Sequence, residues 1–158
     1  TFGNYGERKM KINKYLEELG LTQMDMPGYY NPEEVNEKTE GLPGADCRNQ
    51  EDEQGFCSYE FFNLDYTLDL FVYSKLCYYR EHIAELVTPG RLCANFSSEK
   101  SEEQEKMPQK LWLEILDQII EGFKIAIVGL TEGQEGIDEF KIDRARHLLA
   151  EYWDCLWY

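Results

Sequence analysis

One stretch decides the fold: Asn63–Val87, with the sequence NLDYTLDLFVYSKLCYYREHIAELV. Its apolar residues recur mostly three and four positions apart, which is the period of an amphipathic helix. Asn63 suits the N-cap, and Asp65 places a negative charge in the first turn. Pro89 follows the stretch and favours its end. The pattern predicts a helix over 63–87, carried by Leu64, Leu68, Phe71, Val72, Leu76, Tyr79, Ile83, Leu86 and Val87.

Two more helices follow from the same spacing. Residues 95–107 read as a polar, acidic connector, and Pro108 suits the first turn of the next helix. The stripe of this second helix is Trp112, Ile115, Leu116, Ile119, Ile120, Phe123, Ile127 and Leu130, and the glycines at 129, 133 and 136 interrupt it. A third helix is predicted over about 138–157, with Phe140, Ala145, Leu148, Leu149, Tyr152, Trp153 and Leu156 on its apolar face.

The N-terminal third of the chain is less regular. A short helix is predicted over Glu7–Leu19, with Gly20 at its C-terminal cap. Residues 21–59 form an irregular acidic segment, because proline and glycine interrupt every period there. No segment alternates long enough to build a sheet. We therefore expect an all-α single domain over 1–158: an N-terminal helix within 1–20, a long acidic loop over 21–59, and a bundle core of three main helices over 60–158.

The composition excludes several classes of protein. The chain has 158 residues, with 31 acidic against 16 basic ones and a formal net charge of -15. Nucleic-acid binding needs clustered Lys and Arg, and so does docking on an anionic membrane surface. No apolar run of about 18 residues occurs, so no transmembrane helix is expected. The expected partner is a protein with a basic surface, with no direct nucleic acid and no membrane, and self-association remains open.

The cysteines indicate a reducing compartment. Cys47, Cys57, Cys77, Cys93 and Cys155 lie far apart, without a C-x-x-C pair or zinc-ligand spacing. The chain opens with Thr1-Phe2-Gly3 and shows no basic and apolar signal-peptide pattern. We expect reduced thiols, a cytoplasmic protein and no cofactor.

Carboxylates suggest one catalytic alternative. Glu114, Asp117 and Glu121 share a helix edge, where three carboxylates can hold Mg²⁺. All-α nucleoside triphosphate pyrophosphohydrolases use carboxylates of this kind, on two neighbouring helices. In a chain with this many acids, however, a solvated helix face explains the pattern better.

Histidines and nucleophile motifs give weaker evidence for catalysis. His82 and His147 each have carboxylates within one turn, an arrangement that suits a general base but is commoner in surface ion-pair ladders. The sequence contains no G-x-S-x-G elbow, P-loop or G-x-G-x-x-G motif.

Aromatic residues are abundant, with 11 Tyr, 8 Phe and 3 Trp. Beside Arg80, Arg144 and Arg146 they could stack a base and clamp a phosphate, which makes a nucleotide-binding site the second alternative. They could equally anchor a protein interface. The simplest interpretation is core packing, which we expect for Trp112, Trp153, Phe71 and Phe123.

Residues 55–157 resemble a group of small, uncharacterised bacteriophage proteins. Phe62-Asn63-Leu64-Asp65-Tyr66-Thr67 resembles the aromatic-x-Leu-Asp-Tyr/His-Thr segment that starts their long helix. Trp112-Leu113-Glu114-Ile115-Leu116-Asp117 and the closing Leu156-Trp157 resemble two later segments of theirs. The resemblance implies an all-α phage-type protein, in which Asp65, Trp112, Asp117 and Trp157 are structural. It carries no catalytic motif.

Together these features favour a non-enzymatic accessory protein of a phage, which binds and inhibits a host protein in the bacterial cytoplasm. Its negative charge would imitate that of nucleic acid and counter a host defence. The alternatives are a sponge for a signalling nucleotide and a Mg²⁺-dependent nucleotide pyrophosphohydrolase. The expected contact surface consists of Tyr29, Tyr30, Glu33, Glu34, Glu37, Glu40, Glu51, Asp52 and Glu53.

Overall fold

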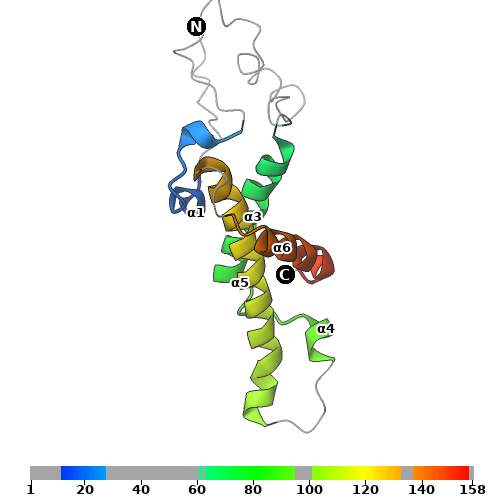
Figure 1. Ribbon diagram of the computed structural model, residues 1–158. Coiled ribbons are helices and arrows are strands. Elements are labelled where there is room, and N and C mark those ends of the chain that lie inside the picture. The colour runs from blue at the N-terminus through cyan, green and yellow to red at the C-terminus, as the bar shows by residue number, and fades with distance from the viewer. Residues whose placement is uncertain (1–11, 28–60, 62, 95–100, 133–136, 157–158) are drawn as a thin grey trace, which may run out of the picture. The chain divides into compact units, whose positions relative to one another are not determined.

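The computed structural model describes residues 12–27, 61, 63–94, 101–132 and 137–156, and within these residues every regular element is helical (Figure 1). The three main helices are α3 (Leu64–His82), α5 (Glu102–Glu132) and α6 (Glu139–Glu151). Short elements complete the described part: α1 (Lys14–Glu17), α4 (Gly90–Cys93) and the 3-10 turns η1 (Gln23–Asp25) and η4 (Trp153–Cys155). The predicted all-α class is confirmed.

The chain divides into two compact units, Thr1–Leu68 and Asp69–Tyr158, and the boundary lies within α3. The prediction of a single domain over the whole chain stays a prediction.

In the first unit, α1 is much shorter than the helix predicted over Glu7–Leu19, of which residues 7–11 lie outside the described part. Asn13 caps α1, because its side-chain oxygen accepts hydrogen bonds from the backbone N–H groups of Tyr15 and Leu16. Gly20 follows with a φ of 79°, a left-handed conformation in which glycine is free of strain. The predicted C-terminal cap at Gly20 is therefore confirmed.

Helix α3 begins where the sequence predicts but ends earlier. The N–H of Thr67 donates to the carbonyl of Asn63, which places the start directly after Asn63. The helix ends at His82 rather than Val87, because the N–H groups of Ile83 and Ala84 both donate to the carbonyl of Tyr79 and close the last turn.

The face of α3 that is buried differs from the predicted one. The buried side chains are Asp69, Leu70, Tyr73, Ser74 and Leu76. Of the predicted stripe, Leu64, Leu68, Phe71 and Leu86 are exposed. The assignment of Phe71 to the core is wrong. The buried face instead includes the polar residues Asp69 and Ser74, whose side chains have hydrogen-bond partners within the fold.

Helix α5 begins at Glu102, so residues 102–107 of the predicted connector are helical. Ser101 acts as its cap: its carbonyl accepts from the N–H of Gln104, and its own N–H donates to the Gln104 side chain. This is the S-x-x-Q signature of a capping box, and three acids follow in the first turn. Pro108 consequently lies inside the helix rather than in its first turn.

Helices α5 and α6 pack on each other and form much of the core. Trp112, Leu116, Ile119 and Ile127 of α5 are almost fully buried, as are Ala145 and Leu148 of α6. The helices approach closely at Gly122, where an added Cβ would overlap the Cβ of Ala145 and lie 2.6 Å from the carbonyl oxygen of Lys141. Any side chain at position 122 would force the two helices apart.

Helix α6 starts at Asp138, whose side chain accepts a hydrogen bond from the N–H of Lys141. It ends at Glu151, and a 3-10 turn replaces the last predicted turn. Phe123 and Trp112 are buried as predicted, but Trp153 is 66% exposed and Phe140 is 78% exposed. The assignment of Trp153 to the core is wrong because the chain leaves the helix before this residue.

Candidate functional site

The predicted contact surface lies outside the described residues: Tyr29, Tyr30, Glu33, Glu34, Glu37, Glu40, Glu51, Asp52 and Glu53. These residues stay a prediction.

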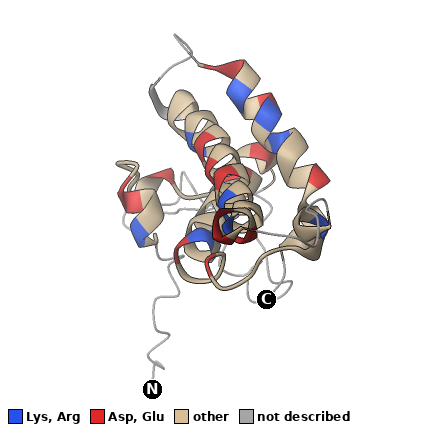
Figure 2. Cartoon of the chain, turned by 90° about the horizontal axis from the view of Figure 1, so that it is seen from below, with Lys and Arg blue, Asp and Glu red and all other residues tan. Residues whose placement is uncertain are grey.

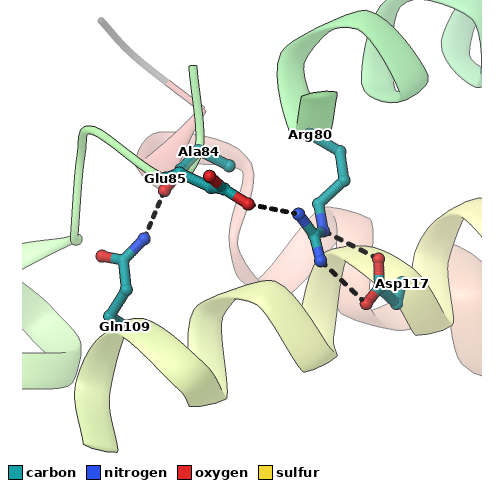
Figure 3. A network of polar contacts seen from close by, with 5 residues as sticks. All are labelled: Arg80, Ala84, Glu85, Gln109 and Asp117. Carbon is teal, nitrogen blue, oxygen red and sulfur yellow. Dashed lines mark hydrogen bonds and ion pairs between the residues drawn. The ribbon is translucent and has the colours of Figure 1, made fainter. Parts of the chain in front are cut away.

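Arg80, at the end of α3, is held by carboxylates of its own chain (Figure 3). Its Nε donates to Asp117 Oδ1 at 2.8 Å and its Nη2 donates to Asp117 Oδ2 at 3.3 Å, a two-pronged pairing between α3 and α5. Glu85 Oε1 lies 3.7 Å from Nη1. Beside this pair, the amide Nε2 of Gln109 donates to the carbonyl of Ala84 at 2.6 Å. The last turn of α3 and the turn that follows it are thus each linked to α5 by side-chain hydrogen bonds.

Two further arginines join other elements in the same way. Arg91 of α4 donates from Nη1 to the carbonyl of Glu151 at 2.7 Å, and its Nη2 lies 3.2 Å from the Glu151 carboxylate. Arg146 of α6 donates from Nη2 to Asp69 of α3 at 3.3 Å. Asp69 is only 5% exposed, so this pair is partly withdrawn from water. The arginine bridges connect α3 with α5, α4 with α6, and α6 with α3.

These bridges bear on the nucleotide-binding alternative. A phosphate at Arg80 or Arg146 would have to compete with Asp117 or Asp69 for the guanidinium. Arg144 differs from them, since it is exposed on α6 and has no ion pair with the described residues. The three arginines therefore do not form one free basic pocket within the described part of the chain.

The carboxylates of the metal alternative are also engaged. Glu114 lies 3.9 Å from Lys110 Nζ, Glu121 lies 4.0 Å from Lys124 Nζ, and Asp117 pairs with Arg80. Within the described residues, no group of three or more His, Cys, Asp or Glu side chains is placed to hold a metal ion. Figure 2 shows acidic and basic positions interspersed along the described helices.

The two histidines have ordinary surroundings. His82 Nε2 lies 3.5 Å from Glu81 Oε2, and its ring stacks against Tyr78 with 4.5 Å between the ring centroids. His147 Nδ1 lies 2.8 Å from the carbonyl oxygen of Asp143, one turn back on the same helix. Both arrangements are those of surface helix positions.

An aromatic cluster surrounds the fully buried Trp112. Its ring centroid lies 6.4 Å from that of Tyr79 and 6.1 Å from that of Tyr152, and the guanidinium of Arg91 stacks 4.8 Å from the Tyr152 centroid. The indole N–H makes no hydrogen bond with the described residues, and the neighbouring Trp112 acts to lower the pKa of Tyr79. Burial outweighs this effect, and the pKa of Tyr79 is raised.

Cys155 closes the same cluster. Burial raises the pKa of its thiol, and the Asp154 carboxylate raises it further, while Arg91 acts in the opposite direction. A thiol kept protonated in this way is a poor nucleophile and a poor metal ligand. Trp112 and Cys155 are both buried, so the cluster contributes to the packing of the fold.

A row of side chains on α3 points away from the core: Phe71, Lys75, Tyr78 and His82, here called the α3 outer face. Phe71 is 62% exposed and Tyr78 is 53% exposed. Lys75 Nζ lies 5.6 Å from the Phe71 ring centroid. The core position of Phe71 was predicted from its spacing alone, and helical spacing does not distinguish an outward face from a buried one.

Comparisons with protein-family models, with curated proteins and with solved structures give no match for this chain. Among the described helices, none is both long and apolar enough to cross a membrane.

Proposed function

We propose that the chain is a non-enzymatic, phage-type accessory protein that binds a basic host protein and inhibits it. It would act in the cytoplasm of a bacterial host, as an acidic competitor of nucleic acid. The observation that carries the proposal is electrostatic: the net charge is -15, and three of the four described arginines, Arg80, Arg91 and Arg146, pair with acids or carbonyls of the chain itself.

The pairing of these arginines within the chain affects the sign of the electrostatic potential at the surface. An arginine that bridges two helices offers less of its positive field to a partner than a free arginine does. The excess of acids is thus presented outward, with Glu103, Glu105 and Glu139 as examples of exposed carboxylates. Such a surface attracts a partner whose own surface is built for phosphate groups.

The same facts support this proposal over its two alternatives. A nucleotide sponge would need Arg80 and Arg146 to leave their carboxylates. A pyrophosphohydrolase would need Glu114, Asp117 and Glu121 to converge on a metal, whereas each of them lies beside a basic side chain.

The test is capture of a partner by the tagged full chain from bacterial lysate in about 0.1 M salt, followed by release in about 0.5 M salt, where charges are strongly screened. A captured protein is then purified and assayed for its own activity with and without the chain. We expect release by salt, loss of the partner's activity, and competition between the chain and duplex DNA. A partner that is held equally at both salt concentrations, or that stays fully active, contradicts the proposal.

Two variants locate the surface. The first neutralises seven acids of the predicted contact segment as amides: Glu33, Glu34, Glu37, Glu40, Glu51, Asp52 and Glu53. The matched control neutralises seven exposed acids of the helices: Glu17, Glu18, Glu105, Glu114, Glu121, Glu139 and Asp143. Both change the net charge equally, so loss of capture with the first variant alone assigns binding to the segment. Equal loss with both variants would assign it to net charge.

A further inference from the structure

The α3 outer face has an unusual composition for this chain. The eleven residues from Leu70 to Arg80 contain no Asp or Glu, although the chain has 31 acids. The exposed members of the face combine two aromatic rings with Lys75 and His82. Protein interfaces are rich in aromatic residues and poor in acids at their centre, which is the composition seen here.

The spacing is that of a helix-pairing seam. Phe71, Lys75, Tyr78 and His82 are separated by four, three and four positions, the alternation that keeps a row of side chains facing a second helix. The residues of α3 that are buried, such as Leu70, Tyr73 and Leu76, lie on the other side. Helix α3 therefore presents one face to the core and a second, regularly spaced face outward.

We infer that the α3 outer face binds the same face of a second copy of this chain, with the two helices antiparallel. A two-fold axis between Leu76 and Cys77 places Lys75 of each copy against Tyr78 of the other. The same axis places Phe71 against His82. Each basic or imidazole side chain then meets an aromatic ring, and the pattern is complementary to itself.

The charges on the α3 outer face favour a second, antiparallel copy of the chain over a basic partner. A basic partner finds Lys75 there and no acid beyond Glu81, which already lies against His82. A parallel pair of copies would oppose Lys75 to Lys75. In the antiparallel pair the cation of one copy faces the negative face of an aromatic ring of the other, and no carboxylate has to be desolvated at the seam.

Dimerisation should depend on salt in the opposite sense to binding of the proposed basic host protein. The two copies repel each other through their net charges, and salt screens this repulsion. The contacts at the seam are apolar and cation–aromatic, and they depend less on salt. The dimer is expected to persist or strengthen as salt rises, whereas a complex built on charge attraction weakens.

The experiment is sedimentation equilibrium of the full chain over about a hundredfold range of concentration, reaching about 1 mM because four side chains per copy make a small interface. The test variants are Lys75→Glu and Tyr78→Ala. Their matched controls are Lys124→Glu, an exposed lysine on α5, and Phe140→Ala, an exposed aromatic residue on α6. Circular dichroism verifies that each variant keeps its helices.

We expect wild type and both controls to dimerise reversibly, and both test variants to weaken the dimer by about tenfold or more. Wild type that stays monomeric throughout, or a dimer that Lys75→Glu leaves intact, overturns the inference. So does an equal loss with Lys124→Glu, since net charge alone would then explain it.

Mixing variants tests the orientation. A mixture of Lys75→Glu with Tyr78→Lys should associate better than either alone, because the antiparallel pair places the new glutamate against the new lysine. A mixture of Lys75→Glu with wild type should associate less well than wild type. Tighter association in that second mixture would indicate a parallel pair, in which the new glutamate lies against Lys75 of the wild-type copy, and would overturn the proposed arrangement.

Discussion

Gly122 of α5 lies against Ala145 of α6 so closely that the space for a side chain at position 122 is already taken by the Ala145 methyl group. Both residues are buried, and the carbonyl of Lys141 closes the other side of the contact. The close approach of the two helices at this point therefore depends on the absence of a side chain at Gly122.

Gly122→Ala is expected to destabilise the fold by about 1–3 kcal/mol, although alanine favours a helix more than glycine does. The atoms in the way are a backbone carbonyl and a Cβ, neither of which can turn aside. The measurement is urea unfolding followed by circular dichroism.

Gly129→Ala is the matched control on the same helix. A Cβ there would meet only the side chain of Ile137, at 2.7 Å from its Cδ1, and an isoleucine side chain can shift. We expect a change within about 1 kcal/mol of wild type. A Gly122→Ala variant as stable as Gly129→Ala would contradict the close packing of α5 on α6.

The ion pair between Asp69 and Arg146 should contribute more to the free energy of unfolding than a surface ion pair does. Arg146→Ala is expected to lower the free energy of unfolding by about 1–3 kcal/mol, because it removes a charged partner from a buried carboxylate. Arg144→Ala, two positions away and exposed, should change it by less than about 0.5 kcal/mol. A double-mutant cycle with Asp69→Ala measures the coupling, and a coupling energy near zero would show that the pair contributes nothing.

Trp112 and Trp153 should differ sharply in fluorescence. Trp112 is fully buried, so its emission is expected at short wavelength and protected from acrylamide, whereas Trp153 is 66% exposed and should be quenched readily. Because the chain has a third tryptophan, Trp157, both variants are made in a Trp157→Phe background. There, Trp153→Phe should remove the quenchable emission with little change in stability. Trp112→Phe should cost about 1–3 kcal/mol through lost packing. Equal quenching of the two variants would contradict the assigned burial.

Stability should fall at alkaline pH through Cys155. Burial raises the pKa of its thiol above the ordinary 9.0, so the folded chain holds this proton more tightly than the unfolded chain does. The stabilisation is complete below the unfolded pKa and is lost as pH rises through the folded pKa. Unfolding by urea at pH 7, 9 and 10 should show this decline.

Cys155→Ala should flatten the decline in stability between pH 9 and pH 10, while Cys93→Ala, a less buried thiol, should leave it as in wild type. Tyr79 and Tyr66, whose pKa values are also raised by burial, add a similar loss above about pH 10 in either variant. A profile unchanged by Cys155→Ala would exclude this thiol as its cause.

Periodicity was sufficient to predict the helices but not which face each one buries. Trp112, Ile119 and Ile127 follow the helical period and are buried as predicted. Phe71 and Leu68 follow it equally well but are exposed. Apolar spacing alone does not distinguish a face that packs on the core from one that faces outward. The partners of Asp69 and Ser74 lie far along the chain or in the backbone, and spacing carries no information about them.

The ends of the helices were missed for local reasons. Pro108 was interpreted as a first-turn proline, although the helix already begins after Ser101, whose N–H donates to the side chain of Gln104. The arginine bridges could not be predicted, because the pairs are separated by 37, 60 and 77 positions in the sequence. Long-range pairs of this kind are specified by the packing of the helices and not by any nearby motif.

Pro108 within α5 has a consequence for how the helix opens. Proline has no N–H to donate to the carbonyl of Gln104, so the ladder of hydrogen bonds is interrupted at this point. The residues before it, 102–107, are all exposed, whereas Trp112, Leu116 and Ile119 beyond it are buried. The first turns can therefore unwind and re-form as a separate cooperative unit, and their amide protons should exchange with solvent long before those of the buried part of the same helix.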